Sequence, residues 1–394
     1  MPFVSGTSLP SSDDVLGLLR GVIDPELGLD IVELGMAKGA TVDPDGVVHV
    51  SVALTTSGCP LRAQIQRDVR ARVGSLPGVT RVRMDWSELT AEEKATAMAR
   101  ARRHIAERTE QTAVPLRTKV IMVASGKGGV GKSSVTVNLA AAMAAGGLTV
   151  GVLDADIWGF SVPRMLGLDG RLEATGDPPR MQPQDLAVGD GLLRVVSMGF
   201  LVEDEESALM WRGLILNRAV QHFLEDVEWG DLDYLLIDMP PGTGDVQMGL
   251  ARMLPRSEMI VVTTPSLNAQ KVAVRVVDMG RKNYLRIVGI VENMSVYVDD
   301  DGREHHIFGH GGGEALAGAC GVELLGVIPI EPDVSTGGDT GTPAALGTGP
   351  AAAAFSELAR VITEEAVPVN ELEGCTARML AAVDEALAAA DAAD

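Results

Sequence analysis

Continuous apolar runs alternate with helical patterns between residues 119 and 358. An uninterrupted apolar run is typical of a strand that is buried on both faces, as in a parallel sheet with helices on each side. We therefore expect an α/β fold with a mostly parallel sheet covered by helices on both faces. The expected strands are Val120–Ala124, Thr149–Leu153, Leu193–Ser197, Tyr234–Ile237, Glu258–Thr263, Arg286–Glu292 and Leu324–Ile328.

Residues 10–86 show a different pattern, which predicts a small α+β domain ahead of this sheet. Asp13–Val22 and Pro60–Val73 place apolar residues at helical spacing, whereas Val47–Leu54 alternates as a half-buried strand does. Val79–Asp85 predicts another short strand.

Capping signals and composition divide the rest of the chain. Ser11 and Ser12 form a good N-cap pair for the first helix, and Thr90 followed by Glu93 has the spacing of a capping box. Residues 335–350 are rich in Gly, Thr, Ala and Pro and predict a loop. The expected domains are an accessory domain (1–86), a helical linker (87–117), the main α/β domain (118–365) and an acidic, alanine-rich helical tail (366–394) that packs on the body or on a partner.

Composition and charge narrow the classes of partner. The chain has 394 residues and a formal net charge of −21, which argues against nucleic acid and against an anionic membrane surface. No run of about eighteen apolar residues predicts a membrane-spanning helix, and the first residues do not resemble a signal peptide. Three cysteines without a close pair do not form a disulfide framework, so we expect a cytoplasmic protein.

The octet GKGGVGKS at residues 126–133 fits the phosphate-binding pattern G-x-x-x-x-G-K-[ST]. An expected strand leads into it, and a helical pattern over Ser133–Ala145 leads out of it. The glycines let backbone N–H groups turn inward around a polyphosphate. We expect Lys132 to reach the β- and γ-phosphates of ATP and the Ser133 hydroxyl to bind Mg²⁺.

The same glycines also fit the dinucleotide-binding pattern G-x-G-x-x-G over residues 126–131. The Lys-Ser pair that directly follows favours ATP, because a dinucleotide site has no use for it. Carboxylates after two strands favour ATP as well. Asp154 and Asp156 suit a metal and its water, and Asp238 ends a buried strand where a Mg²⁺-holding carboxylate is expected.

Lys127 is a second lysine inside the octet, which an ordinary phosphate-binding loop does not need. Its side chain begins too close to its own backbone cradle to add much within one subunit. A lysine at this position can instead reach the phosphates bound by a partner subunit. Lys127 therefore favours a homodimer with ATP between its subunits.

The octet resembles the deviant Walker A motif of the MinD/ParA/nitrogenase-iron-protein class of P-loop NTPases. Within that class the chain resembles the Mrp/ApbC (Mrp/NBP) iron–sulfur cluster carriers. The segments that carry this resemblance are DADIWGFS at 154–161, DMPPGTGD at 238–245, VENMS at 291–295 and IFGHGG at 307–312. Residues 10–86 separately resemble the SufT/PaaD-like iron–sulfur-assembly domain through DPE at 24–26 and TTSGCP at 55–60.

The resemblance implies an Mg²⁺-dependent ATPase and a role for each matched residue. Lys127 would act across the dimer, Asp156 would orient the attacking water, and Asp154 would lie near the metal. Asp238 would hold a metal-bound water. The implied catalytic residues are Lys127, Lys132 and Asp156, and the implied metal residues are Ser133, Asp154 and Asp238.

The resemblance also implies how the nucleotide is read. Gly242 would sense the γ-phosphate through its backbone N–H, and Asn293 would contact the adenine edge. The alternative for Asn293 is a turn at a strand end, and for the aspartates a solvated turn or helix cap. The implied nucleotide-binding residues are Gly126, Lys127, Gly128, Gly129, Val130, Gly131, Lys132, Ser133, Ser134 and Asn293.

The chain departs from the carriers where they hold their cargo. Carriers of this type have a Cys-x-x-Cys shortly after the Asn-Met-Ser segment, and two such pairs would bridge a [4Fe–4S] cluster across the dimer. Here that stretch is Val296–Gly302 and contains no cysteine, with Asp299 at about the place of the first. A hard carboxylate replaces a soft thiolate poorly at such a cluster.

Other residues are candidate ligands. Cys59 lies near a predicted helix N-terminus, where the pKa of a thiol tends to fall, so it is a candidate thiol site. The alternative is a small apolar residue at a turn. His305, His306 and His310 form a loose cluster with a spacing that suits a metal. The alternative is a plain loop, because the adjoining Ile-Phe-Gly segment resembles a loop of the carrier family.

A non-hydrolysing interaction module that ATP merely stabilises is disfavoured, because Lys127, Asp156 and Asp238 are all present. Two other functions remain open. The first is an ATP-hydrolysing iron–sulfur cluster carrier that works as a nucleotide-switched homodimer with iron–sulfur client or assembly proteins. The second is an ATPase switch of the same fold that no longer binds a cluster and regulates or adapts a protein client. The retained accessory domain favours the first function, and the missing cysteine pair favours the second.

Overall fold

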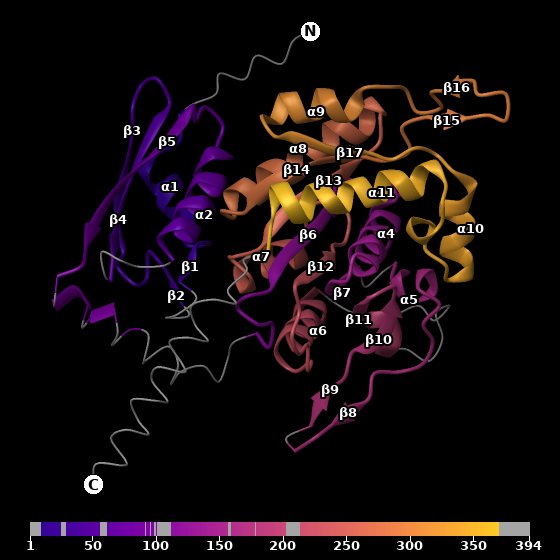
Figure 1. Cartoon of the computed structure of the whole chain (residues 1–394), viewed down its shortest axis with the longest axis horizontal. Coiled ribbons are helices and arrows are strands. Elements are labelled where there is room, and N and C mark those ends of the chain that lie inside the picture. The colour runs from indigo at the N-terminus through magenta and orange to yellow at the C-terminus, as the bar shows by residue number, and fades with distance from the viewer. Residues whose placement is uncertain are drawn as a thin grey trace.

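The computed structural model describes residues 9–369 except 25–28, 56–60, 91, 95, 98–99, 101–111, 157–158, 178 and 202–212. Two units stand side by side in Figure 1: a small one built by the first part of the chain and a larger one around an eight-stranded sheet. We call the elements α1 to β5 the amino-terminal unit, and the large sheet with its helices the main body.

The sheet of the main body confirms the predicted parallel architecture. Its strand order is β10-β11-β7-β12-β6-β13-β14-β17, and every neighbouring pair is parallel except β10 with β11. The strands are β6 (Lys119–Ser125), β7 (Thr149–Asp154), β10 (Gln184–Val188), β11 (Gly191–Ser197), β12 (Tyr234–Asp238), β13 (Glu258–Thr263), β14 (Arg286–Glu292) and β17 (Glu323–Val327). The edge strand β10 was not predicted, because its burial alternates and it lacks an apolar run.

Helices cover both faces of this sheet, as its continuous apolar strands require (Figure 1). Strand β6 shows the division, since Ile121 and Val123 belong to one buried cluster while Met122 and Ala124 belong to the other. The helices of the main body are α4 (Lys132–Ala145), α5 (Val162–Met165), α6 (Gly213–Glu225), α7 (Asp245–Met253), α8 (Leu267–Lys282), α9 (Gly312–Cys320), α10 (Pro332–Thr340) and α11 (Pro350–Arg360).

The amino-terminal unit has the predicted α+β character. Its three-stranded sheet has the order β3-β4-β5, antiparallel in the first pair and parallel in the second, and α1 and α2 pack on it around a separate buried cluster. Ser11 caps α1 in a capping box with Asp14. The elements are α1 (Ser12–Leu19), β1 (Ile23–Asp24), β2 (Leu29–Asp30), β3 (Ala37–Val42), β4 (Val47–Leu54), α2 (Arg62–Gly74) and β5 (Arg81–Glu88).

The smaller elements correct one prediction. Residues 335–350 are not a plain loop, because they include most of α10 and a 3₁₀ turn at Ala344–Leu346. Pro332 opens α10, and Gly341, with a φ of 74°, closes it in the left-handed conformation. The remaining elements are β8 (Ala174–Thr175), β9 (Arg180–Met181), β15 (Tyr297–Val298), β16 (Glu304–His305), a 3₁₀ turn at Met198–Leu201 and a π-helical turn at Val361–Ala366.

Some predictions concern residues outside the described ranges. Cys59 and nearly all of the expected tail helix lie there, as does much of the expected linker helix. The predicted capping box at the start of the linker is present. The backbone N–H of Thr90 donates to the Glu93 carboxylate, and the backbone N–H of Glu93 donates to the Thr90 hydroxyl oxygen. Within the described ranges, no helix is long and apolar enough to span a membrane.

Candidate functional site

The octet 126–133 forms the predicted loop between β6 and α4, at the carboxyl end of the central strand. Gly129 and Gly131 both have a φ of 78°, a left-handed conformation that glycine adopts without strain. Helix α4 begins directly at Lys132. A loop of this shape directs backbone N–H groups and the positive end of the helix dipole to one point, as a phosphate requires.

Gly126 and Gly128 have different packing roles, which predicts different effects of alanine. A Cβ on Gly126 would lie 2.5 Å from the backbone atoms of Val272 and Ala273 in α8, whereas one on Gly128 would meet nothing within 4 Å. We expect Gly126→Ala to destabilise the nucleotide-free protein by about 1–3 kcal/mol through overpacking. Gly128→Ala is the matched control and should leave the thermal unfolding temperature unchanged. Equal unfolding temperatures for both variants would show that α8 does not press on this glycine.

Three carboxylates lie close to the loop because β12 is the neighbour of β6 in the sheet and β7 is the neighbour of β12. Asp154 ends β7 and Asp238 ends β12, and these two residues are paired in register. The Lys132 ammonium lies 2.8 Å from Oδ1 of Asp238 and 3.7 Å from Oδ2 of Asp156. Lys132 is 6% exposed and Asp238 is fully buried. Two carboxylates therefore neutralise the lysine that is predicted to bind phosphate.

Two hydroxyl groups complete the surroundings of Asp238. Ser133 donates from Oγ to Oδ2 of Asp238 at 2.6 Å, which places the predicted Mg²⁺ ligand beside the predicted metal carboxylate. Thr136 lies 2.8 Å from Oδ1 of the same residue. Thr136 was not predicted as a site residue. Its only signal in the sequence is a hydroxyl one helical turn after Lys132.

Asp154 anchors the chain that follows its own strand. Its carboxylate accepts hydrogen bonds from the backbone N–H groups of Asp156, Ser161 and Val162, and from the hydroxyl of Ser197 at 3.0 Å. Burial raises its pKa to about 7, and the nearby Asp238 carboxylate adds to the rise. Asp154 thus fixes the loop that carries Asp156. Ser197, on the adjacent strand β11, gave no signal in the sequence.

Asp156 is more accessible to solvent than Asp154. Its side chain is 14% exposed and lies toward Lys132. Burial raises its pKa, while the Lys132 charge opposes that rise. This position agrees with the expected role beside the phosphates, and the role itself stays a prediction.

The segment after β12 is held by a residue that the sequence did not single out. Gly242 has a φ of 94°, and its N–H donates to the carbonyl of Ser125 at 2.9 Å. Gln247, on α7, donates from Nε2 to the carbonyls of Pro240 and Gly242 at 2.6 and 2.8 Å. The Gly242 N–H is therefore engaged within the protein in this structure, and γ-phosphate sensing would require it to turn.

Asn293 is placed against the loop. Its Nδ2 donates to the carbonyl of Val130 at 2.9 Å, and its side chain is almost fully buried. Ser134 follows Ser133 on α4, and Asn138 donates to its carbonyl. Lys127 is exposed and forms no ion pair with any residue that the structure describes. An unengaged ammonium at the loop surface is what a role across a dimer needs.

The hairpin that replaces the cysteine pair carries no thiol. Its strands β15 and β16 pair antiparallel, and a hydrogen bond of 2.7 Å joins Asp299 to His305 and lowers the pKa of Asp299. The rings of His306 and His310 lie against each other, with centroids 5.4 Å apart. Within the described ranges, no group of three or more His, Cys, Asp or Glu side chains could hold a metal ion, so the structure favours the interpretation of these histidines as part of a loop.

The cysteine thiols decide whether this chain could bind an iron–sulfur cluster. Cys320 is the only cysteine in the described part of the chain, and burial raises the pKa of its thiol. A buried, protonated thiol on the packed face of α9 does not suit iron. The described residues therefore do not supply ligands for an iron–sulfur cluster. The loop, Lys132 and Ser133, by contrast, suit the binding of a nucleoside triphosphate with Mg²⁺.

Comparison with known proteins agrees with this geometry. The chain matches the family described as NUBPL iron-transfer P-loop NTPase over residues 117–363, and the family described as iron–sulfur cluster assembly protein over residues 12–84. It is 44% identical over 339 residues to an iron–sulfur cluster carrier protein of Mycobacterium bovis, which covers 83% of this chain and 86% of the relative.

Two further similarities extend the comparison. An iron–sulfur cluster carrier protein of Synechocystis sp. is 40% identical over 335 residues, which is 84% of this chain and 91% of the relative. A nucleotide-binding protein of Archaeoglobus fulgidus, solved in complex with ADP, is 35% identical with a TM-score of 0.48, and the match covers 57% of this chain and 86% of that chain.

Proposed function

Because this chain belongs to the family of NUBPL iron-transfer P-loop NTPases, we propose that it is an iron–sulfur cluster carrier controlled by ATP. In this proposal the chain works as a homodimer that binds and hydrolyses ATP. Iron–sulfur assembly proteins and client proteins are its partners. A cytoplasmic setting accords with the proposal, since thiolate ligands persist in a reducing compartment.

The contact that carries the ATPase proposal is the ion pair between Lys132 and Asp238. A buried ammonium beside a buried carboxylate is stable only while each neutralises the other. Phosphate oxygens can replace the carboxylate as the partner of Lys132, and a cation can then replace the ammonium as the partner of Asp238. The site is therefore arranged to exchange an internal ion pair for a nucleotide and its metal.

The remaining side chains have distinct tasks in this mechanism. Ser133 and Asp238 would hold Mg²⁺, directly and through water, and Mg²⁺ supplies neutralisation of the developing charge on the phosphates. Asp156 is placed to orient a water molecule, and Asp154 keeps the loop of Asp156 in position. Lys127 of one subunit would neutralise the phosphates of the other. Asn293 would approach the adenine while it supports the loop.

Cluster binding needs ligands that the hairpin lacks. The thiol that remains as a candidate is Cys59, which lies outside the described residues. In a homodimer two copies of Cys59 would supply two of the four thiolates that a [4Fe–4S] cluster normally takes, so the client or a small thiol would supply the rest. The iron–sulfur cluster is thus the transported substrate in this proposal.

The hairpin also supports a second candidate function. Asp299 stands at about the place of the first cysteine of the carriers' pair, and it is hydrogen-bonded to His305. A protein of this fold without a cluster would be an ATPase switch that regulates or adapts a protein client. The two functions share the nucleotide site and differ in iron binding.

Anaerobic reconstitution with iron and sulfide separates these two functions. We expect the wild-type chain to gain visible absorption near the usual charge-transfer range of iron–sulfur clusters, and Cys59→Ser to lose most of it, because a hydroxyl is a poor iron ligand. Cys320→Ser is the matched control and should retain the spectrum. Iron and sulfide content would be measured on the same samples. A featureless wild-type spectrum would favour the regulatory switch.

A further inference from the structure

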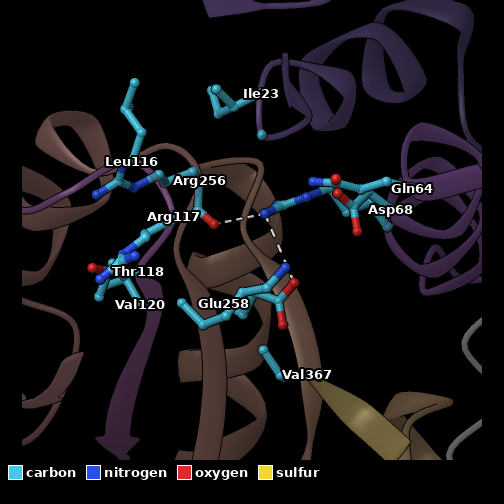
Figure 2. A pocket seen from close by; sticks show the side chains of 13 residues that line it. Ile23, Gln64, Asp68, Leu116, Arg117, Thr118, Val120, Arg256, Glu258 and Val367 are labelled. Carbon is cyan, nitrogen blue, oxygen red and sulfur yellow. Dashed lines mark hydrogen bonds and ion pairs between the residues drawn. The ribbon is translucent and has the colours of Figure 1, made fainter. Parts of the chain in front are cut away.

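The amino-terminal unit meets the main body at the end of the sheet opposite the nucleotide site. A cavity of about 70 Å³ lies at this junction. Figure 2 shows Gln64 and Asp68 of α2 on one side of it, with Arg256 and Glu258 of the main body facing them. Glu258 is the first residue of β13 and Lys119 the first residue of β6, whereas the loop 126–133 follows the last residue of β6.

Arg72 is the central contact of this junction. It lies near the end of α2, is 5% exposed, and donates from Nη2 to the backbone carbonyl of Arg256 at 2.6 Å. The same nitrogen lies 3.8 Å from Oε1 of Glu258. Glu258 is also paired with Arg286 of β14 at 3.1 Å. A guanidinium this deeply buried is costly without such partners, so the contact is specific to this arrangement.

Two further residues of opposite charge, Asp68 of α2 and Lys119 of β6, line the same cavity. Asp68 lies one helical turn before Arg72, and burial raises its pKa while the positive charge of Lys119 opposes the rise. Helix α2 thus presents a negative and then a positive group, and the main body presents Lys119 and Glu258. Any docking that reversed this order would place like charges together at the junction.

Two glycines of the amino-terminal unit give room to side chains at the junction. A Cβ on Gly21 would collide with the guanidinium of Arg72. A Cβ on Gly17 would collide with the ring of Tyr284, which projects from the turn between α8 and β14. Tyr284 has a φ of 59°, an uncommon conformation for an aromatic residue. The shapes of the two units therefore match at a second point.

We propose that the amino ends of β6 and β13, with Tyr284, form a docking surface dedicated to the amino-terminal unit of this chain. The crossed charges fix its orientation, and the contact of Tyr284 with Gly17 fixes its position. The amino-terminal unit then stays bound to the main body. It leaves the loop 126–133, at the other end of β6, uncovered.

The test measures whether the two units remain bound without a covalent link. A recognition site for a specific protease is inserted in the linker after Glu110, and the full-length protein is cleaved and passed over a size-exclusion column. The wild-type halves should elute together. Arg72→Glu should weaken their association at least about tenfold, because it places two carboxylates in one buried site.

Matched variants distinguish docking from misfolding. Arg70→Glu makes the same charge change at an exposed position of the same helix and should leave the halves together. Tyr284→Asn removes a ring that is 42% exposed, in a conformation that asparagine tolerates, and should also weaken the association. Circular dichroism of each intact variant would show that both units are folded.

Clear results would overturn the docking surface. Wild-type halves that separate after cleavage would do so, as would folded Arg72→Glu and Tyr284→Asn proteins whose halves stay together. If Arg70→Glu and Arg72→Glu weakened the association equally, the halves would be held together by the net charge of the unit and not by the specific contacts of Arg72. ATP affinity should be the same in Arg72→Glu and the wild type, because the two surfaces lie at opposite ends of β6.

Discussion

Lys132→Ala is expected to lower the affinity for Mg-ATP by about 100-fold, as removal of one partner from a buried, hydrogen-bonded charge pair commonly does. The ammonium is buried and within 3.7 Å of two carboxylates, so no solvent-exposed group can take over its contact with the phosphates. Isothermal titration calorimetry of the nucleotide-free protein would measure the change.

A surface lysine supplies the control for this prediction. Lys282→Ala removes an ammonium that is largely exposed and paired with Asp278 within α8, so ATP affinity should be unchanged. The Lys132 variant also leaves Asp238 and Asp156 without their cation. Its nucleotide-free unfolding temperature should therefore fall, and a neutral residue at position 238 should restore part of it. Unchanged ATP affinity in Lys132→Ala would refute the phosphate-binding assignment of the octet.

Lys127→Ala is expected to bind Mg-ATP normally and to hydrolyse it about 1000-fold more slowly, the range in which a cation supplied by a partner acts in phosphoryl transfer. Lys127 is exposed and unengaged with the described residues, so its loss should not disturb the fold. A single-turnover measurement at saturating ATP isolates the chemical step.

The role across the dimer adds a dependence on concentration. Wild-type specific activity should rise with protein concentration as dimers form, and Lys127→Ala should show little of this rise even where light scattering detects a dimer. Lys127→Arg retains the positive charge and should recover part of the rate. Single-turnover rates equal to those of the wild type in Lys127→Ala would exclude the role of this lysine across the subunits.

Much of the main body was predictable because its signals are local. The strand that became β13 was predicted with its observed bounds, since its apolar run Met259–Val262 is typical of a strand buried in a parallel sheet. The loop 126–133 was predictable because its conformation depends on glycines at set positions. Strand β10 escaped because an edge strand needs only one apolar face.

The candidate site was predictable only in part. Lys132 and Ser133 are marked by the octet, and Asp154 and Asp238 by their places at strand ends, but Ser197 and Gln247 are ordinary polar residues in the sequence. Their hydrogen bonds to Asp154 and to the carbonyls of the segment after β12 exist because separate elements pack side by side. The histidines after β15 show the converse, since close spacing in the chain did not bring them into one metal site.

The sequence by itself determined the class of fold, the phosphate-binding loop and the absence of the cysteine pair, because these depend on residue types at short, set spacings. The tertiary structure alone decided that Lys132 is held by Asp238, that Asn293 supports the loop, and that Arg72 reaches Glu258. The members of each pair are between 106 and 186 residues apart in the chain, counted from their numbers. Only the pairing of strands in the sheet and the packing of helices against it bring such distant charges and hydrogen-bonding groups within a few ångströms of each other.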